Sequence, residues 1–438
     1  LPGDNIALSR IGADQITAIA NSGTPVSLLA TNNITFSAPI NITNPSISLT
    51  ATAGNNIFVN SDIFTVRGNV TLSALAGDVV VNRAVINSNR PETGIAGDIQ
   101  VFARNQISLI DSLVRARSDG AGGFSTIRLV SSQGSVSLNN SNVSATNFGT
   151  GFAGDIFIDA PNRIDLTNNS QIFSRGTFGR ILLGVSNGEE LVNRRVTALP
   201  ATISISNSTL DAENDVTNQG RIGVFAQTEV AISNSLLRSR SQNTDADNFS
   251  RIEIFARSGS VDLNNATVST TNFDSGLAGD VIISAAERLT VTNDSNIFSR
   301  GRLGRILIGR SNDFSSSYPD FSPNTIAVDN STLNTNNSSV TGVPGTVVNV
   351  GGVSIRANGN ISLANSSSVF SSSNRRGSAG DVDVETRGDL TLTDSDIQSN
   401  LEAGGIGRSG RVRVDARAVF LFTNPNSERA AQIQTLVR

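Results

Sequence analysis

The chain lacks cysteine, histidine, methionine and tryptophan, and it has a single tyrosine, Tyr318. Without cysteine there is no disulfide framework and no thiolate site, and without histidine there is no nucleophile–histidine pair or imidazole metal site. Because methionine is absent, Leu1 is not a translation start. We therefore expect the sequence to be processed or to be part of a longer protein, with any signal peptide outside it.

Long apolar runs and a strong charge bias are also missing. No run approaches the ~18 apolar residues that a membrane-spanning helix needs. All 33 basic residues are arginine, and the net charge of −4 comes from interspersed charges of both signs. This pattern gives no reason to expect nucleic acid or an anionic membrane as a partner.

What the chain does contain is repetition. Residues 123–187 and 248–312 align without a gap at an offset of 248 − 123 = 125, and about 36 of the 65 aligned positions are identical. Inside each copy runs a shorter period of about 25–30 residues. A fixed short period predicts stacked structural units that bury their apolar faces only against one another.

Each short unit contains three alternating apolar and polar stretches, as in Asp280-Val281-Ile282-Ile283, which predict three short strands with one buried face. We predict an all-β, right-handed parallel β-helix of about 14 coils, roughly 65–70 Å long at ~4.8 Å per coil. The predicted coil starts are Val26, Ile47, Val70, Ile99, Ile127, Ile156, Ile181, Ile222, Ile252, Val281, Ile306, Val353, Val382 and Val412.

The β-helix is predicted to span residues 25–422, with an N-terminal coil or cap over 1–24 and a C-terminal tail or cap over 423–438. Two coils are stretched by Pro-, Asn- and Ser-rich segments near 185–200 and 310–324, which we expect to be loops on one edge. The last residues, from Ser427 to Arg438, have a helical spacing of apolar residues.

Stacking in register turns equivalent positions into columns along the axis. The position before the first strand of each unit alternates between aspartate and arginine, which predicts a structural ion-pair column. Its members are Asp155, Arg180, Arg251, Asp280, Arg305, Asp381 and Arg411. One step, from Arg221 to Arg251, brings two like charges together, and the sequence offers no reason for it.

A second column is expected at the Asn/Ser/Asp turn after the second strand, as in Leu138-Asn139-Asn140-Ser141. Short amides and hydroxyls stabilise tight turns by bonding to nearby backbone, and stacked asparagines can also bond along the axis. Ala-Gly-Asp corners such as Ala278-Gly279-Asp280 supply small residues where the chain turns closely.

Carboxylate pairs are the only candidates for acid–base chemistry, and they are Asp381 with Asp383 and Asp394 with Asp396. The simpler interpretation is that these aspartates face solvent on strands or stabilise turns. Arg387-Gly388-Asp389 spells a cell-attachment tripeptide, but it occupies a turn at which other coils carry Gln133-Gly134-Ser135 or Asn358-Gly359-Asn360. No catalytic residue, cofactor or metal site is predicted.

Units of the form Gly-Asp-Ile-x-Ile-x-Ala followed by x-Ile-x-Leu-x-Asn-x-Ser-x-Ile resemble filamentous haemagglutinin-like large exoproteins of the two-partner secretion type, the cyanobacterial members above all. The likeness covers about residues 25–422. It implies export through an outer-membrane secretion barrel, display on or release from the cell surface, and a role in adhesion or surface filaments. The Asn-Pro-Asn-Gly signature of that family's secretion domain is not present.

We therefore expect a secreted, extracellular structural or adhesive protein whose partners are further copies of itself, joined head to tail, and surface glycans or other cells. A carbohydrate-active β-helix enzyme (polysaccharide lyase or hydrolase) and a carbohydrate-binding module are the alternatives. The near absence of Trp and Tyr leaves few of the usual stacking platforms for sugars.

Overall fold

The computed structural model describes residues 10–89, 95–121, 125–152, 154–185, 199–214, 220–242, 250–273, 277–309, 322–336, 351–373, 379–402, 407–425, 427 and 430–437. The loops expected near 185–200 and 310–324 lie almost entirely outside these ranges.

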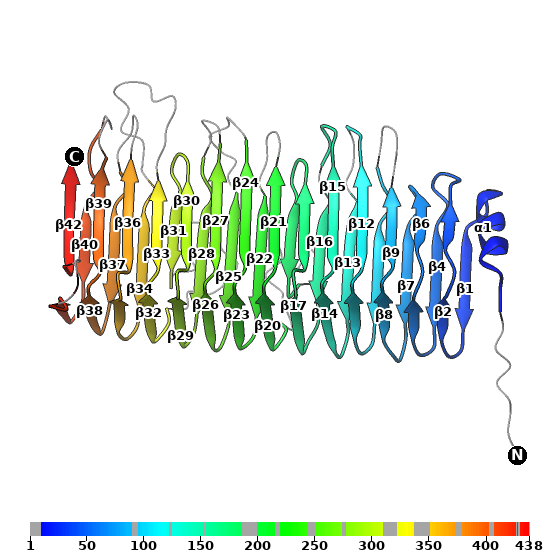
Figure 1. Cartoon of the computed structure of the whole chain (residues 1–438), viewed down its shortest axis with the longest axis horizontal. Helices are drawn as coiled ribbons and strands as arrows, with labels where there is room; N and C mark the ends of the chain where they lie inside the picture. The colour runs from blue at the N-terminus through cyan, green and yellow to red at the C-terminus, as the bar shows by residue number, and fades with distance from the viewer. Residues whose placement is uncertain are drawn as a thin grey trace, which may run out of the picture.

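The described chain folds into three parallel sheets of 14 strands each, and the three sheets form the sides of one rod (Figure 1). The first sheet comprises β1 Val26–Ala30, β4 Leu49–Ala53, β7 Val70–Ala74, β10 Ile99–Ala103, β13 Thr126–Ser131, β16 Asp155–Asp159, β19 Arg180–Leu183, β22 Arg221–Ala226, β25 Arg251–Ala256, β28 Asp280–Ala285, β31 Arg305–Ile308, β34 Val353–Ala357, β37 Val382–Thr386 and β40 Val412–Asp415.

The second sheet comprises β2 Ile34–Phe36, β5 Ile57–Val59, β8 Val79–Asn82, β11 Ile107–Ile110, β14 Ser135–Asn139, β17 Arg163–Thr167, β20 Thr202–Ser206, β23 Glu229–Ser233, β26 Ser260–Asn264, β29 Arg288–Thr292, β32 Thr325–Asp329, β35 Ile361–Ala364, β38 Asp389–Thr393 and β41 Ala418–Phe422.

The third sheet comprises β3 Ile40–Ile42, β6 Ile63–Val66, β9 Val85–Asn89, β12 Leu113–Ser118, β15 Asn142–Asn147, β18 Gln171–Arg175, β21 Thr209–Asn214, β24 Leu236–Ser241, β27 Thr267–Asn272, β30 Asn296–Arg300, β33 Thr332–Asn336, β36 Ser368–Ser373, β39 Asp396–Leu401 and β42 Gln432–Val437.

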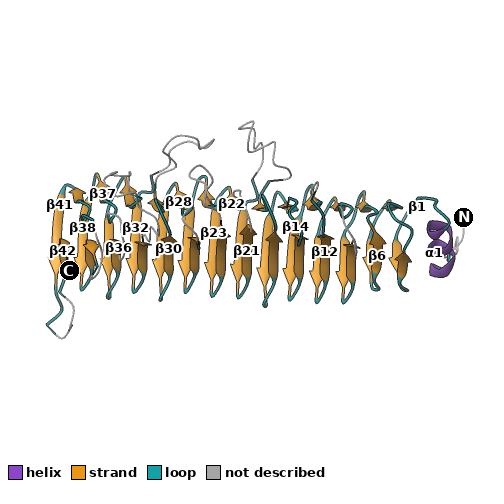
Figure 2. Ribbon diagram, turned by 90° about the horizontal axis from the view of Figure 1, so that it is seen from above, coloured by secondary structure: helices purple, strands orange, loops and turns teal. Residues whose placement is uncertain are grey.

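Each coil contributes one strand to each sheet, so that coil 1 is β1–β3 and coil 14 is β40–β42. Every strand of coils 1 to 13 pairs in parallel with the strand three places further along the chain, and alternate Ile, Val, Leu and Ala side chains fill one continuous core. The all-β parallel β-helix of about 14 coils with three strands per coil is confirmed. Figure 2 shows the sheets running the length of the rod.

Of the predicted coil starts, all but one lie at core positions of the first sheet. The exception is Ile47, because Val26 pairs with Leu49 and Leu49 pairs with Val70. Ile47, Leu49 and Ala51 all share one face of an alternating segment, so the alternation alone does not exclude a slip of two residues.

The turn between the second and third sheets is built as predicted. Its central residue adopts a positive φ in most described coils, and that residue is usually asparagine, as in Asn140 (48°) and Asn265 (49°). The Asn265 Nδ2 donates to Asn234 Oδ1 at 2.8 Å, one coil away. Serine follows in the same turn, where the Ser208 backbone N–H donates to the Ser235 hydroxyl oxygen at 3.0 Å. These side-chain ladders along the axis confirm the predicted turn column.

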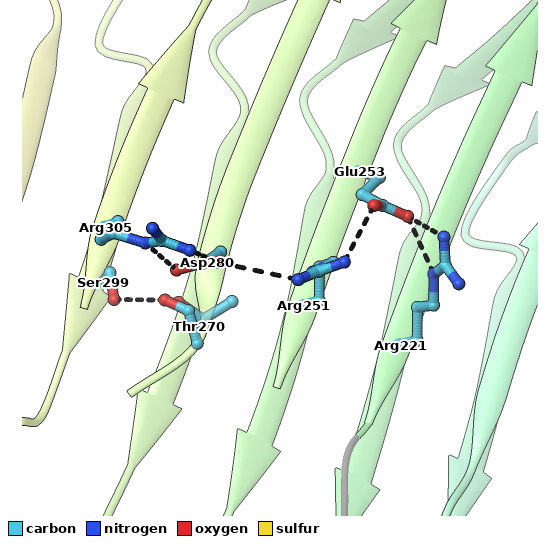
Figure 3. A network of polar contacts seen from close by, with 8 residues as sticks. Arg221, Arg251, Glu253, Thr270, Asp280, Ser299 and Arg305 are labelled. Atoms are coloured by element: carbon cyan, nitrogen blue, oxygen red, sulfur yellow. Dashed lines mark hydrogen bonds and ion pairs between the residues drawn. The ribbon is translucent and has the colours of Figure 1, made fainter. Parts of the chain in front are cut away.

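A buried polar column ties the third sheet to the corner that leads into the next coil. The hydroxyls of Thr270 and Ser299 both donate to the carbonyl oxygen of Gly279, at 2.8 and 2.7 Å (Figure 3). The carbonyl of Gly380 accepts in the same way from Ser399, at 2.9 Å. Small hydroxyl residues thus satisfy backbone groups that turn away from the strand ladders.

The amino-terminal end of the core is covered by the helix α1, Ala13–Asn21, which lies across coil 1 (Figure 1). Ile16 and Ala20, one helical turn apart, are buried against the core. The Asn21 Oδ1 accepts the backbone N–H of Thr43 at 2.7 Å. A coil or a cap was expected over residues 1–24, and the described part of this segment forms a cap. The i, i+4 spacing of Ile16 and Ala20 suits a helix docked on the core, whereas Ile19 is exposed.

At the other end of the described chain, coil 14 is the last coil. The helical pattern predicted after Ser427 is wrong, since β42 completes coil 14 by pairing with β39, Ile397 beside Ile433. The exposed edge of β39 offers a full ladder of backbone partners, which overrides a weak local preference. The solenoid therefore extends beyond residue 422, and among the described residues the only cap is the helix α1 at the amino-terminal end.

Candidate functional site

Residues at the start of the first-sheet strands form an ion-pair column along one edge of the rod. The Asp280 carboxylate accepts hydrogen bonds from Arg305 Nε and Nη2 at 2.9 and 2.6 Å, and its Oδ2 lies 3.9 Å from Arg251 Nη2 (Figure 3). At the equivalent step of the first long repeat, Arg180 Nε donates to Asp155 Oδ1 at 3.0 Å. Fork-to-fork pairing of this kind fixes geometry as well as charge.

The hydrogen bond to Asp155 raises the pKa of the Arg180 guanidinium above its ordinary value. The nearby carboxylate charge acts in the same direction, and burial opposes both. The remaining predicted pair, Asp381 with Arg411, lies near coil 14, with a 3.2 Å contact between largely exposed side chains. Asp381 Oδ1 also accepts the backbone N–H of Arg411 at 2.8 Å, so its carboxylate aligns the next coil.

The like-charge step in this column has a structural reason. Arg180 pairs with Arg221, and Arg221 with Arg251, so three arginines stack in consecutive coils. Glu253, two residues along β25, contacts both Arg221 and Arg251 (Figure 3). The counter-charge comes from the outer face of the strand and not from the column itself, which is why the column sequence did not reveal it.

A second network lies on the outer face of the third sheet and was missed in the sequence. Asp211 accepts hydrogen bonds from Arg238 Nη2 at 2.6 Å and from Arg240 Nη2 at 2.9 Å, and Glu213 accepts from Arg240 at 3.0 Å. The hydrogen bond to Asp211 raises the pKa of Arg238. The signal was present, since Asp211-x-Glu213 and Arg238-x-Arg240 occupy matching positions of adjacent strands.

The candidate acid pairs are engaged in structural contacts. Asp381 binds Arg411, and Asp383 lies beside Ser354 and Arg413 in neighbouring strands. Asp394 accepts the backbone N–H of Asn424 at 2.7 Å. Asp396 is buried and accepts from the Ser368 hydroxyl at 2.7 Å. Asp381 and Asp383 lie at the first sheet of coil 13, whereas Asp394 and Asp396 lie at the turn into its third sheet. Their contacts with residues of the neighbouring coils align coils 12 to 14.

The Arg387-Gly388-Asp389 tripeptide is built into the turn before β38. Arg387 is exposed and Gly388 is buried. Asp389 accepts hydrogen bonds from Arg417 Nε and Nη2 at 2.9 and 2.7 Å. These hydrogen bonds lower the pKa of Asp389, with the charge of Arg417 adding to the effect and desolvation opposing it. The Asp389 carboxylate therefore links coil 13 to coil 14.

A shallow groove of about 350 Å³ follows the turn column over coils 3 to 6. Its polar lining includes Arg83, Asp111 and Asn140, and its apolar lining includes Val85 and Leu113. Asn140 Nδ2 donates to Asp111 at 2.8 Å, and Arg83 lies 3.7 Å from the same carboxylate. These side chains contact one another along the rod axis. The groove is therefore lined by the side-chain ladder of the turn column, whose polar groups already have partners in the protein.

Among the described residues, no helix is long and apolar enough to cross a membrane, and no three carboxylates lie close enough together to hold a metal ion. Comparison of the chain with protein-family models, with curated proteins and with solved structures gave no match. The geometry described above is therefore the basis for the functional proposal.

Proposed function

We propose that this chain is an extracellular structural and adhesive rod that assembles end to end into a filament or forms part of one. The single observation that carries the proposal is the far edge of coil 14, which no described residue covers. The strands β40, β41 and β42 pair on one side only within the described chain. Val419 and Leu421 occupy core-facing positions, beside Leu390 and Leu392, yet they are 44% and 50% exposed.

Unpaired strand edges around an exposed apolar core are a template for further strands. End-to-end contact is heterologous, so nothing closes it, and open fibres follow. The amino-terminal end carries the covering helix α1. In our proposal α1 leaves coil 1 when the carboxyl end of another copy pairs with β1–β3, so the helix acts as a removable cap.

The extracellular and adhesive parts of the proposal have different support. They follow from the resemblance of the repeat units to filamentous haemagglutinin-like exoproteins, which also implies passage through an outer-membrane secretion barrel. The engaged carboxylates give the enzyme alternative no specific support.

The test is assembly of purified chain, followed by light scattering and electron microscopy. We expect filaments, faster growth when Ile16→Asp loosens the helix cap, and loss of growth in Leu421→Lys. The matched control is Leu75→Lys, because Leu75 is 62% exposed in a turn on the side of the rod. Protection of β37–β39 from hydrogen exchange verifies that coil 13 of each variant is folded. Isolated rods at all concentrations, with the cap intact or loosened, would contradict the proposal.

A further inference from the structure

The groove over coils 3 to 6 has a second wall, and this wall differs from the turn column. It is formed by the first residues of the strands β9, β12, β15 and β18, which lie beside one another in register. All of them line the groove, and we call them the strand column. They are Val85, Leu113, Asn142 and Gln171.

The strand column has an aliphatic half and an amide half. Val85 and Leu113 are half-buried neighbours in adjacent strands, so their side chains form one small apolar surface. Asn142 and Gln171 continue the column over the next two coils. Because adjacent strands lie ~4.8 Å apart, the column is about 14 Å long. An elongated molecule lying along the rod would contact the apolar surface at one end and the amides at the other.

The amide half has hydrogen-bonding capacity that the protein does not use. Asn142 Oδ1 is buried and has no hydrogen-bond partner among the described residues. Gln171 is exposed, and no described residue bonds to its side-chain amide. A covered acceptor without a partner costs free energy until a water molecule or a ligand supplies a donor. The amide half is therefore the part of the groove that is available to a ligand.

The lining favours an uncharged ligand that is rich in hydroxyl groups. A side-chain amide offers donors and an acceptor together, which matches the donor and acceptor of a hydroxyl group. Among the residues that line the groove, Arg83 and Asp111 are the charged ones, and they lie 3.7 Å apart and offset each other. The aliphatic half suits the C–H face of a sugar ring, which is apolar.

An extended peptide fits the groove less well. Such peptides are commonly recognised at an unpaired strand edge, where backbone groups supply the hydrogen bonds. The strands of the strand column are paired on both sides. For example, β9 pairs with β6 and β12, and β18 pairs with β15 and β21. The groove therefore offers side chains and no free strand edge.

The second long repeat provides an internal comparison. Thr267 and Asn296 occupy the positions of Asn142 and Gln171, and they are paired in the same way. Threonine has no amide, so the second repeat keeps one amide of the pair. Asn296 is therefore a matched control for Gln171, on the same face of the rod but in a different setting.

We propose that this groove binds a neutral polysaccharide chain lying along the rod axis. The C–H faces of its sugar rings pack on Val85 and Leu113, and its hydroxyl groups bond to the amides of Asn142 and Gln171. This proposal deepens the adhesive part of the proposed function and rests on it for the setting. Binding is measured on chain that does not assemble, so its failure is separate from a failure to form filaments.

The experiment is affinity electrophoresis of the Leu421→Lys chain, which does not assemble in our account. Native gels contain hydroxyethylcellulose, xyloglucan, galactomannan or dextran as neutral polysaccharides. Gels with alginate and with gelatin serve as controls for a charged polysaccharide and for a polypeptide. We expect at least one neutral polysaccharide to retard the chain and both controls to leave its mobility unchanged.

Substitutions in the amide half separate binding from folding. Gln171→Ala should weaken binding about tenfold without changing thermal stability, because its amide bonds to no described residue. Asn142→Ala removes an unpaired buried acceptor, so stability should be retained or raised while affinity falls about tenfold. Asn296→Ala should leave binding unchanged. No retardation by any neutral polysaccharide, equal retardation by alginate or gelatin, or equal losses in Gln171→Ala and Asn296→Ala would overturn the proposal.

Discussion

The carboxylate of Glu253 accepts a hydrogen bond from Arg221 Nε at 2.8 Å across two adjacent coils. Its other oxygen lies 3.5 Å from Arg251 Nη1, and the glutamate side chain is only 7% exposed. One acid on the outer face of β25 therefore neutralises a run of stacked arginines. Without it, like charges about 4.8 Å apart would oppose stacking.

Glu253→Gln should destabilise the middle of the rod by about 2–3 kcal/mol, because it leaves the partly buried Arg221 guanidinium without its counter-charge. Hydrogen exchange of β22 and β25 should report the loss. The control is Glu385→Gln, since Glu385 is 44% exposed and lies 3.5 Å from Arg356. That change should cost less than about 1 kcal/mol. Equal effects of the two substitutions would contradict a special role for Glu253.

The asparagine turns should be sensitive to backbone conformation and not only to polarity. Asn265→Ala should destabilise by about 2 kcal/mol, because alanine disfavours the positive φ and loses the bond to Asn234. Asn265→Gly should cost about half as much, because glycine accepts the conformation. Urea unfolding followed by exchange in β26 and β27 measures both. If glycine proves worse than alanine, the turn assignment is wrong.

Thr270 and Ser299 share one acceptor, the Gly279 carbonyl, so their contributions should be coupled. Thr270→Val and Ser299→Ala should each cost about 1 kcal/mol, since the other hydroxyl still donates. The double variant should cost more than the sum of the two. A double-mutant cycle measures the coupling, and simple additivity would show that the carbonyl does not depend on this pair.

The last coil should loosen in acid. Arg417 lowers the pKa of Asp389, so the pair contributes stability above the pKa of an unfolded aspartate and loses it as pH falls through the lower folded value. From about pH 5 to about pH 2, exchange of the β41 amides, corrected for intrinsic rates, should rise. Arg417→Gln should flatten this dependence. An unchanged acid response in that variant would assign the effect to another group.

The sequence was sufficient to predict the three-stranded coils, their number and most of their starts, because a parallel solenoid repeats one alternating pattern against one core. It was also sufficient to predict the turn ladder, where asparagine is suited to positive φ. Alternation could not distinguish Ile47 from Leu49, which share a face. The cap allowed for residues 1–24 is the helix α1, but the helical pattern predicted after Ser427 was wrong, since the pairing of Ile433 with Ile397 depends on a contact distant in sequence.

The ion pairs were likewise predictable only where the repeat register places both partners in one column. Asp280 and Arg305 fall in one column, so their contact was predictable from the register alone. Glu253 lies two residues outside that column, and the Asp211 network lies on another sheet.

The central claim is that the rod grows end to end through coil 14, and helical reconstruction of assembled filaments tests it most directly. Our account predicts that β40–β42 of one copy pair with β1–β3 of the next, that the ~4.8 Å strand spacing continues across the junction, and that α1 no longer covers coil 1. A junction without backbone pairing at β41, or filaments in which α1 remains over coil 1, would contradict it.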